Sequence, residues 1–318
     1  MHTMIVHNNT VALNVVLAGP ENCPDLPILC VHGWPELSHS WRHQMAHFAA
    51  RGRRIAAMDV RGYGASDKPH AIAAYSLSAL AADVAAVIAA LGGRAILIGH
   101  DWGAPIVWNT ALRHPDAVAA VAGLSVPFSP WGEVRFLDMM RMMHAGKFFY
   151  QFYFQAEGVA EAELAADPDA LAKLYFALSG DAPYPGFGRK LPDATVLAGL
   201  PLPDPLPDWM PAGDLAIYKA AFAAGGWRGP INRYRAQDID FDEAFPLRGQ
   251  MISQPAAFIA GTRDPVRHFA PGMDLYATAG AGCSDFRGTT LVEGAGHWVQ
   301  QEAPAATNAA LSAFVDGL

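Results

Sequence analysis

Short runs of apolar residues alternate along this chain with longer segments of helical periodicity. Such short runs, bounded by Gly, Pro or Arg, are typical of buried strands, and they occur at 27–31, 54–58, 94–98, 120–124, 256–260 and 289–292. Segments 78–91, 103–114 and 303–315 have the pattern of helices, the first with Ser78 as its expected N-cap and Gly92 just past its end. Strands that alternate with helices predict a mostly parallel sheet with helices on both faces.

The pattern changes after Pro127. From 129 to 245 the chain has aromatic and Met-rich helical segments and a proline-dense stretch at 200–211, without a strand-like run. We therefore expect one α/β core, made of residues 1–128 and 246–318, that is interrupted by a helical insertion over 129–245. An insertion after a sheet strand can lie over the carboxyl ends of the strands, where open α/β sheets place their sites.

Length, composition and net charge limit the classes of protein to which this chain can belong. The length of 318 residues fits an α/β domain with an insertion. Hydrophobic residues make up 52% and charged residues 16%, so a large core is easily filled. The net charge of −8 and the absence of a Lys/Arg run argue against a nucleic-acid partner.

The sequence also bears on compartment and cofactors. Residues 1–10 lack the order of a signal peptide, and Asp83 interrupts the best apolar run, so we expect a cytoplasmic protein that does not enter membranes. Cys23, Cys30 and Cys283 are an odd, sparse set that fits a reducing compartment. Cys and His residues do not cluster with metal-ligand spacing, and we expect no metal or organic cofactor. The oligomeric state stays open, a homodimer included.

Candidate chemistry begins at Asp101, in the sequence Gly99-His-Asp-Trp-Gly103. This pentapeptide lies between a predicted strand and a predicted helix, the context of a nucleophile elbow, with Asp where hydrolases often have Ser. The flanking glycines permit the sharp turn that such a residue needs. Taken alone, the pentapeptide fits an ordinary strand–helix turn with Asp101 as N-cap equally well.

Three other turns favour the elbow. His32-Gly-Trp-Pro35 follows strand 27–31, where a second oxyanion-hole amide would lie, so the donors would be the backbone N–H groups of Trp34 and Trp102. Asp264 follows strand 256–260, and His297 follows strand 289–292, which gives the order nucleophile, acid, base of α/β-hydrolases. We expect His32 to be structural, and Pro35 to favour an extended or cis Trp34.

With these residues in place, the sequence closely resembles the epoxide hydrolases of the α/β-hydrolase superfamily. The core motifs are His32-Gly-Trp-Pro-Glu36, Asp59-Val-Arg-Gly-Tyr-Gly-Ala-Ser66, Gly99-His-Asp-Trp-Gly103 and Gly296-His-Trp298. Within the insertion, the segment around Tyr150 and the segment around Tyr234 look like the parts of that family's cap that carry its two epoxide-binding tyrosines. The resemblance runs from about Val31 to Pro304 and implies an α/β-hydrolase fold with a helical cap.

The resemblance also implies a mechanism for a small-molecule epoxide substrate. Asp101 would form an alkyl ester, Tyr150 and Tyr234 would protonate the epoxide oxygen, and His297, oriented by Asp264, would activate water against the ester. Tyr153 lies three residues from Tyr150, so both could share one helix face, and only the family's register selects Tyr150. Glu36 would be a water-orienting group or a solvated loop carboxylate.

Related activities remain as alternatives. Haloalkane dehalogenases share the Asp nucleophile, the following Trp and the Asp–His pair, but they often carry Asn where this chain has Trp34. Fluoroacetate dehalogenases usually have Arg where this chain has Trp102, and a serine esterase would need Ser at 101. A catalytically silent receptor on the same fold would be expected to lack part of the constellation.

Overall fold

The computed structural model describes residues 1–182, 190–270 and 272–318, and within them eight strands form one sheet. The spatial order is β1-β2-β4-β3-β5-β6-β7-β8, with β2 antiparallel to both of its neighbours and the pairs from β4 to β8 parallel. The strands are β1 (His2–Asn8), β2 (Val11–Ala18), β3 (Ile28–Val31), β4 (Ile55–Met58), β5 (Ala95–His100), β6 (Val118–Leu124), β7 (Ile252–Gly261) and β8 (Cys283–Val292). The predicted α/β sheet is thus confirmed.

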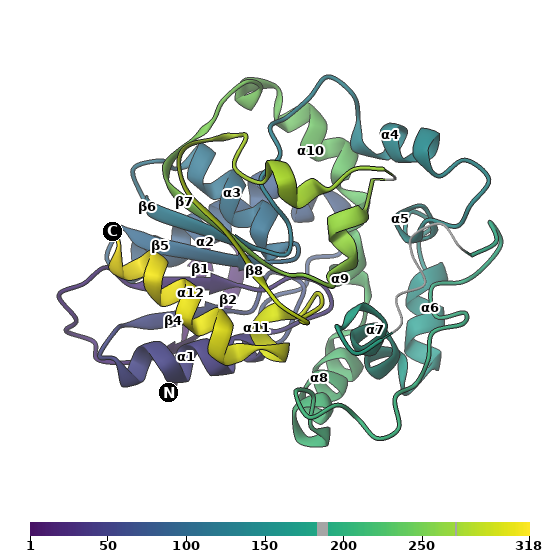
Figure 1. The fold of residues 1–318 in the computed structure, drawn as a ribbon, viewed down its shortest axis with the longest axis horizontal. Helices are drawn as coiled ribbons and strands as arrows, with labels where there is room; N and C mark the ends of the chain where they lie inside the picture. The colour runs from purple at the N-terminus through teal and green to yellow at the C-terminus, as the bar shows by residue number, and fades with distance from the viewer. Residues whose placement is uncertain (183–189, 271) are drawn as a thin grey trace.

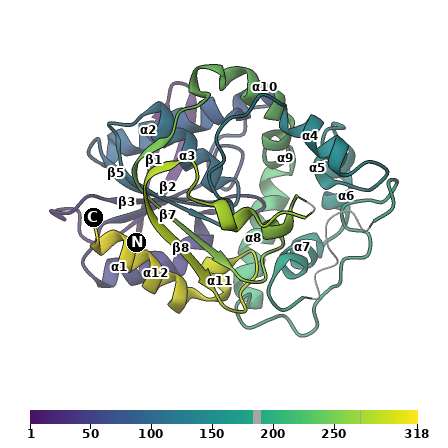
Figure 2. The same ribbon diagram turned by 45° about the horizontal axis from the view of Figure 1, so that its top comes forward.

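Side chains alternate between the two faces of the sheet along each strand, and helices cover both faces, so the central strands are buried on both sides. In β3, Leu29 and Val31 pack in the cluster that contains α2 (Leu77–Leu91) and α3 (Gly103–Arg113). Ile28 and Cys30 point the other way, toward α1 (Arg42–Ala50) and α12 (Pro304–Asp316). Figures 1 and 2 show these two helical layers on opposite faces of the sheet. Because both faces of a central strand are covered, consecutive positions along it are apolar.

The hairpin of β1 and β2 was not predicted from the sequence. Most β1 side chains are exposed at the sheet edge, so the strand is polar and lacks an apolar signal. β7 and β8 are both longer than predicted. β8 is the other edge of the sheet and is exposed over much of its length, so most of it lacks an apolar signal. The predicted N-cap of α2 was wrong: Ser76, not Ser78, caps the helix, and its hydroxyl accepts from the backbone N–H of Ala79 at 3.3 Å.

Between β6 and β7, the described residues form helices and contain no strand. Residues 183–189 of the predicted insertion lie outside the described part of the chain. Both views place α5, α6 and α7 together on one side of the molecule, with α9 between the sheet and α5 and α6 (Figures 1 and 2). The helices are α4 (Phe136–Met143), α5 (Tyr150–Tyr153), α6 (Val159–Ala166), α7 (Ala170–Leu178), α8 (Ala212–Gly225), α9 (Arg228–Arg235) and α10 (Gln237–Glu243).

The remaining helical elements of the described residues are short. α11 (Val299–Glu302) is a single turn that follows the loop after β8, and short 3₁₀ turns occur at Ser38–Trp41, Ile72–Tyr75, Phe245–Leu247, Pro265–His268 and Leu275–Thr278. Among the helices that the structure describes, none is long and apolar enough to cross a membrane.

Candidate active site

Asp101 occupies a sharp turn between β5 and α3. Its φ of 50° lies in the left-handed region, which costs a non-glycine residue about 1–2 kcal/mol. The turn closes only because its flanks are glycine. A Cβ on Gly99 would lie 2.2 Å from the carbonyl oxygen of Gly103, and a Cβ on Gly103 would lie 2.0 Å from that of Val31. Strain of this kind is characteristic of functional turns.

Two backbone amides lie at the Asp101 carboxylate. The N–H of Trp34 donates to Asp101 Oδ1 at 2.7 Å. The amide of Trp102 is close by, since a Cβ added to Gly33 would meet both Asp101 Oδ1, at 2.4 Å, and the Trp102 nitrogen, at 2.6 Å. The peptide bond between Trp34 and Pro35 is cis. The absence of a side chain at Gly33 therefore leaves space next to both the Asp101 carboxylate and the Trp102 backbone nitrogen.

His297 bridges the two acidic residues. Its Nδ1 lies 3.1 and 3.2 Å from the two carboxylate oxygens of Asp264, and its Nε2 lies 3.3 Å from Asp101 Oδ2. His297 and Asp264 are each only 2% exposed. The structure thus brings together three residues that the sequence separates by up to 196 positions. This is the geometry of a nucleophile, a base and an orienting acid.

The same contacts shift the pKa values of the pair. Burial alone would lower the pKa of His297, but the Asp264 and Asp101 carboxylates outweigh it and hold that pKa well above its usual range. Burial alone would raise the pKa of Asp264, but the charge of His297 and its hydrogen bond lower it. Asp264 therefore stays ionised, and His297 holds a proton more tightly while Asp101 carries its charge.

The loop that carries His297 is held by residues that sequence reasoning missed. The carbonyl oxygen of His297 accepts from His100 Nε2 at 2.7 Å and from the Ser125 hydroxyl at 2.8 Å. The carboxylate of Glu302 accepts from the backbone N–H of Gly296 at 2.8 Å and of Trp298 at 2.9 Å. Both neighbours of His297 are thus fixed by one side chain, and nothing in the local sequence around Glu302 marks it for this role.

Glu36 is fully buried, so it is not a solvated loop carboxylate. It accepts from the backbone N–H of Gly33 at 3.1 Å, from His100 Nδ1 at 2.6 Å and from the side chains of Gln300 and Gln301. Burial alone would raise the pKa of Glu36, but His100 and the other donors lower it. Since His100 also holds the His297 carbonyl, Glu36 and His100 tie the loop before Trp34 to the loop of the base.

His32, which we expect to be structural, contacts two backbone groups. Its Nδ1 lies 2.9 Å from the Gly33 carbonyl oxygen, and its Nε2 accepts from the backbone N–H of Val60 at 3.0 Å. Burial lowers the pKa of His32, which favours the neutral ring that this pattern requires. His32 therefore braces the loop that carries the Trp34 amide.

The insertion brings two tyrosines close enough to Asp101 for its charge to affect them. Tyr150 begins α5, Tyr234 lies in α9, and their ring centroids are 5.7 Å apart. Burial raises the pKa of both hydroxyls, and the charge of Asp101 raises them further, so both hydroxyls stay protonated near neutral pH. Gln151 donates to the Tyr150 oxygen at 3.0 Å, so this phenol oxygen acts as an acceptor there.

Tyr153 faces elsewhere. Burial and a hydrogen bond with Glu163 raise the pKa of Tyr153 to about 12, and its ring packs 5.8 Å from that of Phe148. Asp101 has no part in that shift, in contrast to Tyr150 and Tyr234. The structure therefore separates two residues that the sequence alone placed on one helix face.

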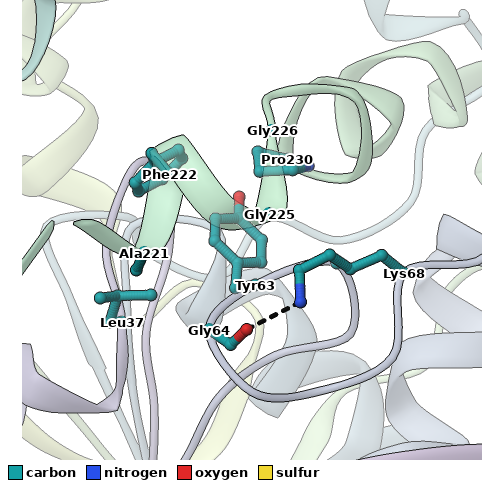
Figure 3. Close-up of a pocket in the computed structure, with 10 residues that line it drawn as sticks. Leu37, Tyr63, Gly64, Lys68, Ala221, Phe222, Gly225, Gly226 and Pro230 are labelled. Carbon is teal, nitrogen blue, oxygen red and sulfur yellow. Dashed lines mark hydrogen bonds between the residues drawn. The ribbon is translucent and has the colours of Figure 1, made fainter. Parts of the chain in front are cut away.

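A hollow too narrow to admit a water molecule lies between α8 and the loop after β4 (Figure 3). Tyr63, Phe222 and Gly225 line it, and Lys68 on its rim donates to the Gly64 carbonyl oxygen at 2.7 Å. Its described lining contains none of the triad residues. Within the described residues, no group of three or more His, Cys, Asp or Glu side chains could hold a metal ion.

Known proteins resemble this chain over most of its length. Residues 27–304 match the family model of the alpha/beta hydrolase fold. Epoxide hydrolase A of Mycobacterium tuberculosis is 41% identical over 319 residues, which cover 99% of this chain and 97% of that protein. The crystal structure of epoxide hydrolase A from Mycobacterium thermoresistibile superposes with a TM-score of 0.92 at 40% identity, covering 100% of this chain and 98% of that one. An epoxide hydrolase from an endophytic Streptomyces gives 0.90 at 39% identity, covering 99% and 95%. The chain therefore belongs to the α/β hydrolase fold family and, within it, to the epoxide hydrolases.

Proposed function

We propose that this protein hydrolyses epoxides to vicinal diols by way of an ester on Asp101. The observation that carries the proposal is the environment of that carboxylate. Asp101 sits in a strained turn between the Trp34 amide and His297, and it faces two protonated tyrosines from the insertion. A carboxylate can attack carbon without losing a proton, whereas an epoxide oxygen needs a proton as it leaves.

The first step opens the ring. One oxygen of Asp101 attacks an epoxide carbon, the carbon–oxygen bond of the ring breaks, and the departing oxygen takes a proton from Tyr150 or Tyr234. The products are a hydroxyalkyl ester on Asp101 and one tyrosinate. General acid assistance of this kind is typically worth about 10²–10⁴-fold in rate. The buried Gln237 supports the arrangement, since its side chain donates to the Gln151 side chain and to the Tyr234 carbonyl oxygen, both at 2.9 Å.

The second step hydrolyses the ester. His297 takes a proton from water as the water oxygen attacks the ester carbon, and the amides of Trp34 and Trp102 hold the oxyanion that forms. The imidazolium then returns its proton to the departing diol oxygen. The carboxylic acid left at Asp101 ionises, and its proton restores the tyrosinate, so the cycle consumes one water and no other reactant.

Asp101 loses its charge when the ester forms, and this loss changes the pKa of His297 between the two steps. The free carboxylate raises the pKa of His297, but an ester carries no charge. Ester formation therefore lowers that pKa, so His297 gives its proton to solvent and becomes the neutral imidazole that accepts a proton from water. When Asp101 regains its charge at the end of the cycle, His297 takes a proton back from solvent. Asp264 remains ionised beside Nδ1 and stabilises the imidazolium that follows.

We further propose that residues 129–245 act as a cap over the strand ends. The backbone N–H of His297 donates to the carbonyl oxygen of Leu178, at the end of α7, at 2.9 Å. Aromatic rings crowd the nucleophile from the insertion side, where Phe154 lies 5.0 Å from Tyr234 and 5.4 Å from Trp34 between ring centroids. Such a lining suits apolar epoxides of moderate size.

Product analysis tests the proposed activity. Incubation with styrene oxide should yield phenylethane diol at a rate that a chelator does not reduce. Parallel incubations with haloalkanes and with an ester test the related activities of this fold. Halide release from haloalkanes, with no diol from any epoxide, would replace the proposal with a dehalogenase.

A further inference from the structure

Arg233 is a buried charge that directly precedes Tyr234 in α9. It is 2% exposed, and its terminal nitrogens donate to the backbone carbonyl of Tyr75 and to the carboxylate of Asp240. Asp240 is 3% exposed and accepts from the backbone N–H of Leu77, the first residue of α2, at 2.6 Å. Arg233 therefore joins α9 to the core directly through Tyr75, and indirectly through Asp240 of α10, which binds the start of α2.

The guanidinium also lies over the ring of Trp102. The distance from Arg233 Cζ to the ring centroid is 4.8 Å, which is a cation–π contact. Tyr234 meets the same indole edge to face, with centroids 5.3 Å apart and planes at 83°. Two consecutive side chains of α9 thus hold the indole of the residue that follows the nucleophile.

An apolar side chain could fill the space that Arg233 occupies. Burying an ion pair costs several kcal/mol of desolvation, and apolar residues of similar volume often serve stability equally well. A guanidinium adds a planar surface that can stack while its terminal nitrogens donate in fixed directions. Within the described residues the Nε of Arg233 has no hydrogen-bond partner, so the two terminal nitrogens are its anchors.

We infer that Arg233 is a positioning residue for ring opening, which acts by fixing the Trp102 indole against which the proton donor Tyr234 is set. The inference rests on the proposed role of Tyr234. Side-chain movement of Trp102 leaves its amide in place, because α3 holds the peptide through the bonds from Ala104 N–H to the Asp101 carbonyl and from Ile106 N–H to the Trp102 carbonyl. Loss of Arg233 therefore slows ester formation far more than ester hydrolysis.

Arg235, two residues further along α9, offers a matched control. It is also buried, at 7% exposure, and its guanidinium pairs with Glu161 at 2.6 Å and donates to the carbonyl oxygens of Phe154 and Ala156. All these partners lie within the insertion, and none of them is Trp102. An Arg235→Lys variant perturbs a buried arginine of the same helix without touching the Trp102 indole.

A double-mutant cycle tests the inference. Single turnovers of styrene oxide, with enzyme in excess, give the rate of substrate loss and the rate of diol release separately. We expect Arg233→Met to slow substrate loss by about 10- to 100-fold, since a misplacement of about 1 Å can cost 10²-fold. The same change should have almost no further effect in a Tyr234→Phe background, and its full effect in a Tyr150→Phe background, because it acts through Tyr234 alone.

Each possible result of this cycle either supports or overturns the proposed role of Arg233. Equal slowing with and without the Tyr234 hydroxyl would overturn the inference, as would unchanged substrate loss in a folded Arg233→Met variant or equal slowing by Arg235→Lys. If Arg233→Met does not fold, Arg233→Lys replaces it in the cycle, since it keeps the charge beside Asp240 but not the planar stack. If wild type opens no epoxide, or Tyr234→Phe does not slow substrate loss, the proposed function fails instead.

Discussion

Gly33→Ala probes the oxyanion site with a single methyl group. The added Cβ would lie 2.4 Å from Asp101 Oδ1, 2.5 Å from Asp101 Cβ and 2.6 Å from the Trp102 nitrogen. Real Cβ atoms essentially never approach closer than 3.0 Å, so the first separation has to grow by at least 0.6 Å (3.0 − 2.4). Taken along the bond from Trp34 N–H to Asp101 Oδ1, that shift stretches 2.7 Å to about 3.3 Å.

The methyl group thus lengthens the hydrogen bond from the Trp34 N–H and lies against the backbone nitrogen of Trp102. Removal of one oxyanion donor typically costs about 10²–10³ in kcat, so we expect a loss of at least about 10² in the rate of ester hydrolysis. Overpacking of the turn should cost about 1–3 kcal/mol of unfolding free energy. Single-turnover kinetics with styrene oxide measure the first effect, and urea unfolding measures the second.

Gly213→Ala is the matched control for this variant. Gly213 lies in α8, is exposed, and has nothing within 4 Å of an added Cβ. Alanine there should leave the rate of hydrolysis unchanged and raise stability slightly, since alanine is the better helix former. A folded Gly33→Ala protein that hydrolyses the ester at the wild-type rate would refute the placement of the oxyanion site.

Three other variants test the remaining roles. Asp264→Asn removes an anion that raises the pKa of His297, so the rise of diol release with pH should move to lower pH and reach a lower plateau; a move to higher pH would contradict this. His297→Gln should gain one substrate mass and stall, and a folded variant without an adduct would show that the base acts earlier. Tyr150→Phe with Tyr234→Phe should nearly abolish substrate loss in single turnovers, whereas Tyr153→Phe should be mild; a larger loss at Tyr153 would move the assignment.

Prediction from the sequence succeeded where burial is continuous. Residues 28–31 and 95–100 lie in the middle of the sheet, so their apolar runs reflect two covered faces. The strand His2–Asn8 lies at the edge and has mostly exposed side chains, so its polar sequence carried no such signal. Ser76 and Ser78 are chemically alike, and only the backbone path decides which of them caps α2.

Some residues of the site could be predicted from the sequence, and others could not. Asp101, Asp264 and His297 were predictable because each follows a strand that the pattern reveals, and the carboxyl ends of parallel strands meet at one edge of the sheet. Ser125 and Glu302 were not, because their roles arise from hydrogen bonds to the loop around His297 that only the folded chain creates.

The central claim is the ester on Asp101, and labelled water tests it most directly. A single turnover of styrene oxide in H₂¹⁸O, with enzyme in excess, should leave the heavy oxygen in the carboxyl group of Asp101, because water attacks the ester carbon. The diol released in that turnover should be unlabelled, since its new oxygen comes from the protein. Heavy oxygen in the first diol, with none in a peptide that contains Asp101, would mean that water attacks the epoxide directly and would contradict the account.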